Sequence, residues 1–279
     1  MTKIALITGT SSGIGLYTAV QFAQAGMTVI ATMRNLEKST ALQSAAQQAG
    51  VELQIMQLDV QDHASVERCV NQLILQHGRI DVLVNNAGAG FLAAMEETSM
   101  NDLQQVMDVN FYGVWRVTQA VFPHMQKAGS GRIISVSSIG GLLGQPFNDA
   151  YCAAKFAVEG FMESLAPVAL RLGIQVSLIE PGPVHSEFVT NVQNQNQYLQ
   201  RHIASYDAMR DAYLAAASQA YAHAGQTAAE VAAIIYTAAT AEQVHFRYAT
   251  SDMIRGVISK KYTDPSGDSV LALVGARLP

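Results

Sequence analysis

The chain has 279 residues, 49% of them hydrophobic and 14% charged, with a formal net charge of -5 at pH 7. That length gives ample apolar surface for a core, and so low a charge content excludes the concentrated basic surface that a nucleic-acid partner requires. No stretch reaches the roughly 18 uninterrupted apolar residues of a membrane span, and the first strand-like run begins at Lys3, so we expect no membrane segment, no signal peptide and a cytoplasmic location.

Short apolar runs alternate along the chain with longer segments of helical period. The predicted strands are KIALIT, TVIATM, ELQIMQL, IDVLVNN, RIISVSS, IQVSLIEPG and VHFRYAT, and the predicted helices include 14–25, 36–49, 64–76, 100–127, 151–172 and 227–239. Strands that are apolar on both faces and are separated by helix-length crossovers indicate a parallel sheet with helices on both sides. We therefore predict an α/β fold with a doubly wound (Rossmann) sheet of about seven strands.

No linker interrupts the pattern, so residues 1–279 are predicted to form one domain. Residues 191–225 are rich in Gln, Asn and Ala and have a weak helical pattern. We expect this segment to be a helical lid beside the substrate cleft.

A glycine-rich turn, TGTSSGIG, follows the first strand and opens the first helix. Missing side chains let the backbone approach a pyrophosphate, and the free amides of the helix N-terminus attract it. We predict that a dinucleotide contacts Gly9, Ser11, Ser12, Gly13, Ile14 and Gly15.

The end of the second strand indicates which dinucleotide binds. Met33 stands where an NAD-preferring protein offers an acid to the ribose hydroxyls, and Arg34 follows it. A guanidinium can pair with a 2'-phosphate. NADP(H) is therefore favoured over NAD(H), unless Arg34 is simply solvated.

Further candidate cofactor contacts follow the third, fourth and sixth strands. Asp59 could accept from the adenine amino group beside Val60, although an Asp at this place could equally cap a helix. The remaining candidates are Asn86, Ala87 and Gly88 in NNAG, and Pro181, Gly182, Val184 and Ser186 in PGPVHS, where an ordinary Pro-Gly turn would look much the same.

Tyr151 and Lys155 are the strongest candidates for chemistry, with Ser138 upstream in SVSSIGG. Residues at i and i+4 share one face of a helix, so the ammonium can lie near the phenol and favour its ionised form. Ser138 would orient a substrate oxygen. Asn110 lies inside a predicted helix, where a polar side chain often bends the backbone.

Two other kinds of site are not expected. Cys69 and Cys152 are predicted to be reduced thiols, and Cys152 has no evident histidine partner that would make it a nucleophile. The seven histidines are scattered without a ligand spacing, so no metal site is predicted.

Taken together, TGTSSGIG, NNAG, Asn110, Ser138, YCAAK and Pro181-Gly182 resemble the short-chain dehydrogenase/reductase family in order and spacing. The resemblance implies hydride transfer between NAD(P)(H) and a carbonyl or alcohol, with Tyr151 as general acid/base. It also implies that Lys155 lowers the pKa of the tyrosine and holds the nicotinamide ribose. Ser138 would bind the substrate oxygen, and Asn110 would position a water in a proton relay.

A finer similarity points to the subgroup with the estrogenic 17-beta-hydroxysteroid dehydrogenase and the photoreceptor retinol dehydrogenase. It rests on GGLLGQPFNDAYCAAKFAVEGFMESL, SLIEPGPVHSEF and the late DPSG. At the position of a lid histidine that anchors the steroid, this chain has Ala216, which argues against a steroid bound in that way.

The predicted function is an NADPH-dependent reduction of a fairly apolar small-molecule ketone or aldehyde, which can be bulky, reversible from the alcohol. A 3-oxoacyl thioester is an alternative substrate, and a non-catalytic NADP(H)-binding sensor is an alternative class. The helix 151–172 is apolar nearly all round, which predicts a homo-oligomer, a dimer or tetramer. Candidate pocket-lining residues, each as well explained by core packing, are Phe91, Leu142, Leu143, Phe147, Phe188, Tyr213 and Tyr221.

Overall fold

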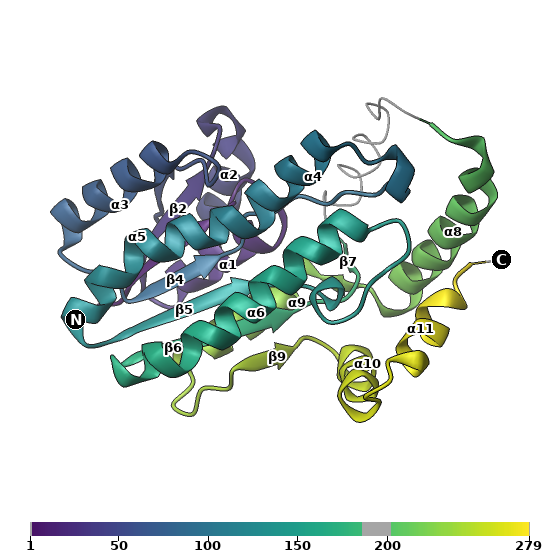
Figure 1. Cartoon of the computed structure of the whole chain (residues 1–279). Coiled ribbons are helices and arrows are strands. Elements are labelled where there is room, and N and C mark those ends of the chain that lie inside the picture. The colour runs from purple at the N-terminus through teal and green to yellow at the C-terminus, as the bar shows by residue number, and fades with distance from the viewer. Residues whose placement is uncertain (1, 186–201, 279) are drawn as a thin grey trace.

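A seven-stranded parallel sheet forms the centre of the computed structural model, which describes residues 2–185 and 202–278 (Figure 1). The strand order is β3-β2-β1-β4-β5-β6-β9. The strands are β1 (Ile4–Thr8), β2 (Thr28–Met33), β3 (Gln54–Gln57), β4 (Val82–Asn85), β5 (Gly131–Val136), β6 (Ile174–Glu180) and β9 (Arg247–Ala249). This confirms the predicted doubly wound sheet.

Helices cover both faces of the sheet. One face packs against α3 (His63–His77), α5 (Gly113–Ala128) and α6 (Asp149–Arg171). The other packs against α1 (Gly13–Gln24), α2 (Thr40–Ala49) and α9 (Ala228–Thr240). Consecutive residues of a strand point to opposite faces, so Leu6 enters the first layer and Ile7 the second.

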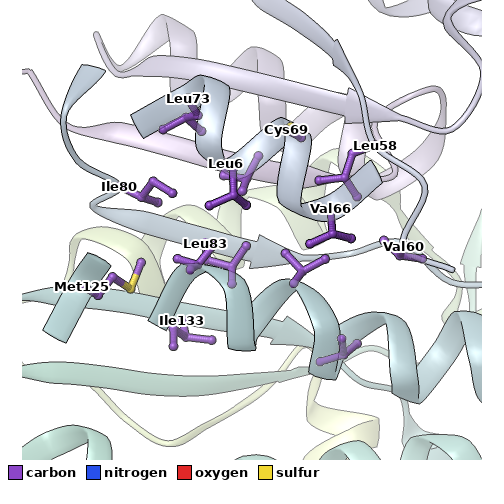
Figure 2. Close-up of a cluster of buried hydrophobic side chains, with 14 of the residues drawn as sticks. Leu6, Leu58, Val60, Val66, Cys69, Leu73, Ile80, Leu83, Met125 and Ile133 are labelled. Atoms are coloured by element: carbon purple, nitrogen blue, oxygen red, sulfur yellow. The ribbon is translucent and has the colours of Figure 1, made fainter. Parts of the chain in front are cut away.

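The first layer is a continuous apolar core between the sheet and its helices. Figure 2 shows Leu6 and Leu83 of the sheet facing Val66 and Leu73 of α3. All four side chains are fully buried. Burying a residue of this size stabilises the fold by roughly 1.5–3 kcal/mol, so this layer fixes the strand ends against the helices.

The strand order reverses beside β1, which has β2 on one side and β4 on the other. Ligands of open parallel sheets bind at such a reversal, outside the carboxyl ends of the strands. Figure 1 shows α8 (Asp207–Ala224), α10 (Asp252–Thr263) and α11 (Asp268–Gly275) beyond this edge.

Several elements differ in detail from the predicted pattern. The predicted helix 100–127 is divided into α4 (Met100–Met107), a π-helical turn (Asp108–Tyr112) and α5, and the segment 36–49 begins with a 3-10 turn (Leu36–Ser39). The segment after β6 contains β7 (Val184–His185), which pairs with β8 (Gln226–Thr227). Shorter 3-10 turns lie at Met95–Glu97, Ile139–Gly141 and Ala204–Tyr206.

Candidate active site

The glycine turn packs tightly against the end of β4. Gly9 has φ +70°, and a Cβ there would lie 2.7 Å from the Cα of Ala87. A Cβ on Gly15 would lie 2.4 Å from Nδ2 of Asn86, which itself donates to the carbonyls of Thr8 and Gly9 at 2.9 and 3.0 Å. Asn86 and Ala87 therefore hold the turn, and larger residues at Gly9 or Gly15 would disrupt it.

The glycine turn places the uncapped N-terminus of α1 at the carboxyl edge of the sheet. Gly13 has φ +57° and begins α1, Ser12 makes no side-chain cap, and the first turn carries no acidic residue. Ile14 belongs to the same turn of helix, and its carbonyl accepts from Thr18. Unpaired amides at such an end suit an anion. The phosphates of a dinucleotide therefore fit here, next to Ser11 and Ser12.

A cavity of about 320 Å³ lies beside this helix end. Its lining includes Ser12 and Gly13 from the turn and His185 from β7. Sequence reasoning selected the neighbours Val184 and Ser186 and missed His185. His185 stands between these two residues in PGPVHS, so the motif itself points to its position.

Arg34, the residue predicted to bind the 2'-phosphate of the cofactor, directly follows β2. Met33 is buried, and the Arg34 guanidinium makes one long hydrogen bond, 3.4 Å, to Oε1 of Gln61. Arg34 has no carboxylate partner among the described residues. Asp59 accepts from the backbone of Gln61 at 3.0 Å, and the buried Val60 offers its carbonyl to Arg116.

Asn110 lies in the π-helical turn and is fully buried. Its Nδ2 donates to the carbonyls of Ala89 and Val106 at 2.9 and 3.0 Å. A Cβ on Gly88 would lie 2.9 Å from Oδ1 of Asn110 and 3.7 Å from Nζ of Lys155. The structure thus brings Gly88, Asn110 and Lys155 together.

Ser138, Tyr151 and Lys155 meet at the carboxyl end of β5. Tyr151 hydrogen-bonds to Ser138, whose Oγ also accepts from the backbone of Gly140 at 3.0 Å. Lys155 donates to the carbonyl of Val136 at 3.0 Å, and its Nζ lies 5.8 Å from the centre of the Tyr151 ring. The predicted trio therefore meets at one site, in which Lys155 is buried and Ser138 and Tyr151 are half-buried.

Burial dominates the electrostatics of this trio. It raises the pKa of Tyr151 above its usual value, and the hydrogen bond to Ser138 offsets this only in part. Burial also lowers the pKa of Lys155 to about 8, against the opposing charge of Glu159. The expected lowering of the Tyr151 pKa by Lys155 stays a prediction.

The residues that follow β6 contact both the loop after β5 and helix α10. The Pro181 carbonyl accepts from Ile139 at 2.9 Å, and a Cβ on Gly182 would lie 2.7 Å from Ile254 of α10. Val184 begins β7. The predicted residues Ser186 and Phe188, and the lid segment up to residue 201, lie outside the described residues.

Most of the predicted pocket-lining residues are well packed. Phe91 belongs to the cluster that contacts Tyr151, while Phe147 and Tyr213 pack together with Leu92. Tyr221 of α8 stands beside His185, and Leu142 and Leu143 are buried. Within the described part of the predicted lid, Ala204–Tyr206 form a 3-10 turn and Asp207–Ala224 form α8.

Within residues 2–185 and 202–278, no His, Cys, Asp or Glu side chains form a group that could hold a metal ion. In the same part of the chain no helix has the length and apolar character needed to cross a bilayer.

The fold and the site define a class of protein, and the chain belongs to the short-chain dehydrogenase family, whose model matches residues 3–197. It is thus an oxidoreductase that uses a nicotinamide cofactor. It is 41% identical to retinol dehydrogenase 8 of Bos taurus, over 95% of this chain and 86% of the relative. It is also 40% identical to the human 17-beta-hydroxysteroid dehydrogenase type 1, over 95% of this chain and 83% of the relative.

A third relative is the 3-ketodihydrosphingosine reductase of Bacteroides thetaiotaomicron, 39% identical over 68% of this chain and 66% of its own length. Among solved structures, a short-chain dehydrogenase/reductase from Burkholderia phymatum in complex with NAD superimposes with a TM-score of 0.81 at 26% identity. That match covers 96% of this chain and 95% of the other. The subgroup similarity predicted from the sequence is confirmed.

Proposed function

We propose that the protein reduces apolar ketones or aldehydes with NADPH, and oxidises the corresponding alcohols in reverse. The observation that carries this proposal is the meeting of Ser138, Tyr151 and Lys155 at the sheet edge that also presents the glycine turn. A proton donor and a dinucleotide site on one edge are what a carbonyl reduction requires.

Bound at this edge, the cofactor supplies the hydride. The Tyr151 phenol gives its proton to the carbonyl oxygen of the substrate; an ordinary tyrosine is already protonated at neutral pH, and burial raises the pKa of Tyr151 further. The Ser138 hydroxyl orients the same oxygen and stabilises its developing negative charge. Lys155 offers a positive charge beside the tyrosine, and Asn110 fixes the loop at Ala89 next to it.

The cofactor preference follows from Arg34. Among the described residues, the Arg34 guanidinium has only its long hydrogen bond to Gln61 to exchange for a 2'-phosphate, and Met33 offers no acid to repel that phosphate. The cofactor would also contact Asp59 and Val60 at the adenine, Asn86, Ala87 and Gly88 along the middle, and the residues after β6 at the nicotinamide.

An apolar substrate is supported by the names of the relatives. Retinol, hydroxysteroids and ketodihydrosphingosine are large and apolar, and Phe91 and Phe147 bring aromatic side chains close to the site. Ala216 of α8 gives no polar anchor for a steroid.

We also propose that two copies associate through an aromatic face of α5 and α6. Trp115 is 44% exposed and stacks on Phe161 of α6 with ring centres 4.4 Å apart. An exposed tryptophan that stacks on a half-buried phenylalanine is typical of an interface between copies. The two cysteines are unpaired and buried, which suits the proposed cytoplasmic location.

NADPH oxidation by the purified protein tests the proposed function. The substrates are a steroidal ketone, a retinoid aldehyde, a long-chain ketone and a 3-oxoacyl thioester, each with NADPH and with NADH. We expect turnover of at least one apolar ketone or aldehyde and a preference for NADPH. Turnover of the thioester alone would favour the alternative substrate, and tight NADPH binding without any turnover would indicate a sensor.

A further inference from the structure

A buried ionic cluster lies directly behind the candidate active site. Glu159 stands one helical turn after Lys155 on α6 and is only 5% exposed. Its Oε2 accepts from Nη1 of Arg247 on β9. The same Nη1 also donates to Oε1 of Glu180, the last residue of β6, at 2.6 Å, and Nη2 donates to Glu163 at 2.8 Å.

This cluster carries more negative than positive charge. One guanidinium faces three carboxylates, two of them buried, and burial raises the pKa of Glu180 to about 7 despite the hydrogen bond from Arg247. The Lys155 ammonium is the remaining buried cation in its field, and Lys261 of α10 lies nearer the surface. A buried charge is retained only where an opposite charge compensates it. Glu159 and Lys155 therefore stabilise each other's charged forms.

Glu159 also contacts the strand end that carries the site. A Cβ on Gly141 would lie 2.6 Å from Oγ of Ser137 and 3.2 Å from Oε1 of Glu159, so both oxygens face one small space. Burial raises the pKa of the Glu159 carboxyl, and Ser137 and Arg247 offset this only in part. Among the described residues, neither Oγ of Ser137 nor Oε1 of Glu159 has a hydrogen bond of good geometry. Ser137 stands between Val136, which accepts from Lys155, and Ser138.

We propose that Glu159 is a positioning residue of this active site. Its buried carboxylate keeps the Lys155 ammonium charged and supports the strand end that presents the Val136 carbonyl and Ser138. This inference rests on the proposed function, because the charge on Lys155 matters only if Tyr151 handles a proton beside it. The groups that face Glu159 are Lys155 and Glu163 of α6, Ser137 after β5, Glu180 of β6, Arg247 of β9, and Lys261 and Tyr262 of α10.

The sign of the expected effect follows from the charge. Lys155 is charged below its pKa of about 8, so reduction that needs its ammonium decreases as the pH rises through that value. Removing the Glu159 charge lowers the pKa of Lys155 further. An opposite charge at several ångströms shifts a pKa by about one unit. The decrease of kcat/KM at high pH, called the alkaline limb of the pH profile, should therefore occur about one pH unit lower in Glu159→Gln than in wild type.

Glu163→Gln is the matched control. Glu163 binds the same arginine from the same helix, but its side chain is 69% exposed and lies one turn further from Lys155. Loss of an exposed ion pair has little effect on the charge of a buried group, so kcat/KM of Glu163→Gln should decrease at the same pH as in wild type. Glu159→Asp retains the charge and should restore the limb at least in part.

Titration of Lys155 itself separates this inference from the proposed function. The ε-carbon of labelled lysine, assigned by its loss in Lys155→Arg, reports the charge by NMR in the cofactor-free protein without any turnover. We expect a lower Lys155 pKa in Glu159→Gln than in wild type and Glu163→Gln. Equal titration in all three, in folded proteins of similar melting temperature, would overturn the role of Glu159 even if wild type reduces ketones. A protein that reduces nothing would instead refute the proposed function, and the NMR titration would still decide the charge coupling.

Discussion

The phenol of Tyr151 and the ammonium of Lys155 perform different tasks in this structure. Burial raises the pKa of the phenol, which is already protonated at neutral pH, whereas burial lowers the pKa of the lysine to about 8. Of these two residues, Lys155 is therefore the one that titrates near neutral pH. The pH dependence of reduction should report the lysine and its partner Glu159 before it reports the tyrosine.

Arg34 provides a prediction for cofactor choice. Arg34→Asp should lower kcat/KM for NADPH relative to NADH by roughly 30-fold, because a charge-assisted contact worth about 2 kcal/mol is replaced by repulsion. Steady-state kinetics with both cofactors measure the ratio. Lys38→Asp, an exposed cation on the following 3-10 turn, is the control and should leave the ratio within twofold. If the two variants behave alike, Arg34 does not recognise the phosphate.

The predicted site residues could be found because they stand in local patterns at strand ends. Parallel strands bring their carboxyl ends to one edge, so Gly9, Asn86 and Ser138 could be placed together from the sequence. Glu159, Glu180 and Arg247 could not be linked in this way, because their contact depends on how α6 packs against β6 and β9.

The elements themselves were predictable wherever periodicity is strong. The seven strands and the helices flanking them appear close to their expected ranges, since apolar residues recur with the spacing of each element. The π-helical turn at Asp108–Tyr112 was only hinted at by Asn110, because its side chain pairs with Ala89, a contact distant in sequence. The β7–β8 pair was not predicted, because two-residue strands have no period.

A buried ion pair contributes to the attachment of α8, together with the packing of Tyr213 against Leu92 and Phe147. Glu97 accepts from Arg210 of α8 and from the backbone of Ile203, and its side chain is fully buried. Breaking a buried pair costs about 3 kcal/mol, so Glu97→Gln should speed amide hydrogen exchange in α8 on the order of 100-fold and raise KM for the carbonyl substrate. Asp207→Asn, which removes an exposed partner of the same arginine, is the control. Equal exchange in the two variants would show that Glu97 does not hold the helix.

At the scale of the whole molecule, the aromatic face of α5 and α6 predicts assembly. Trp115→Glu should convert a dimer to a monomer in light scattering at micromolar concentration, because it places a charge on the proposed interface. Leu75→Glu, on an 87% exposed residue of α3, should leave the mass unchanged. A wild-type monomer would contradict the proposal directly. That residues 1–279 fold as one unit, with 191–225 as its lid, stays a prediction.

The most direct test of the account is the Tyr151→Phe variant, compared with Tyr213→Phe, which alters a buried tyrosine outside the trio. With an apolar ketone that wild type reduces, Tyr151→Phe should lower kcat at least about 100-fold because the proton donor is lost. NADPH affinity, measured by fluorescence titration, should remain within a few fold of wild type. A Tyr151→Phe protein that binds NADPH and still reduces the ketone at a near wild-type rate would contradict the central claim that this phenol donates the proton.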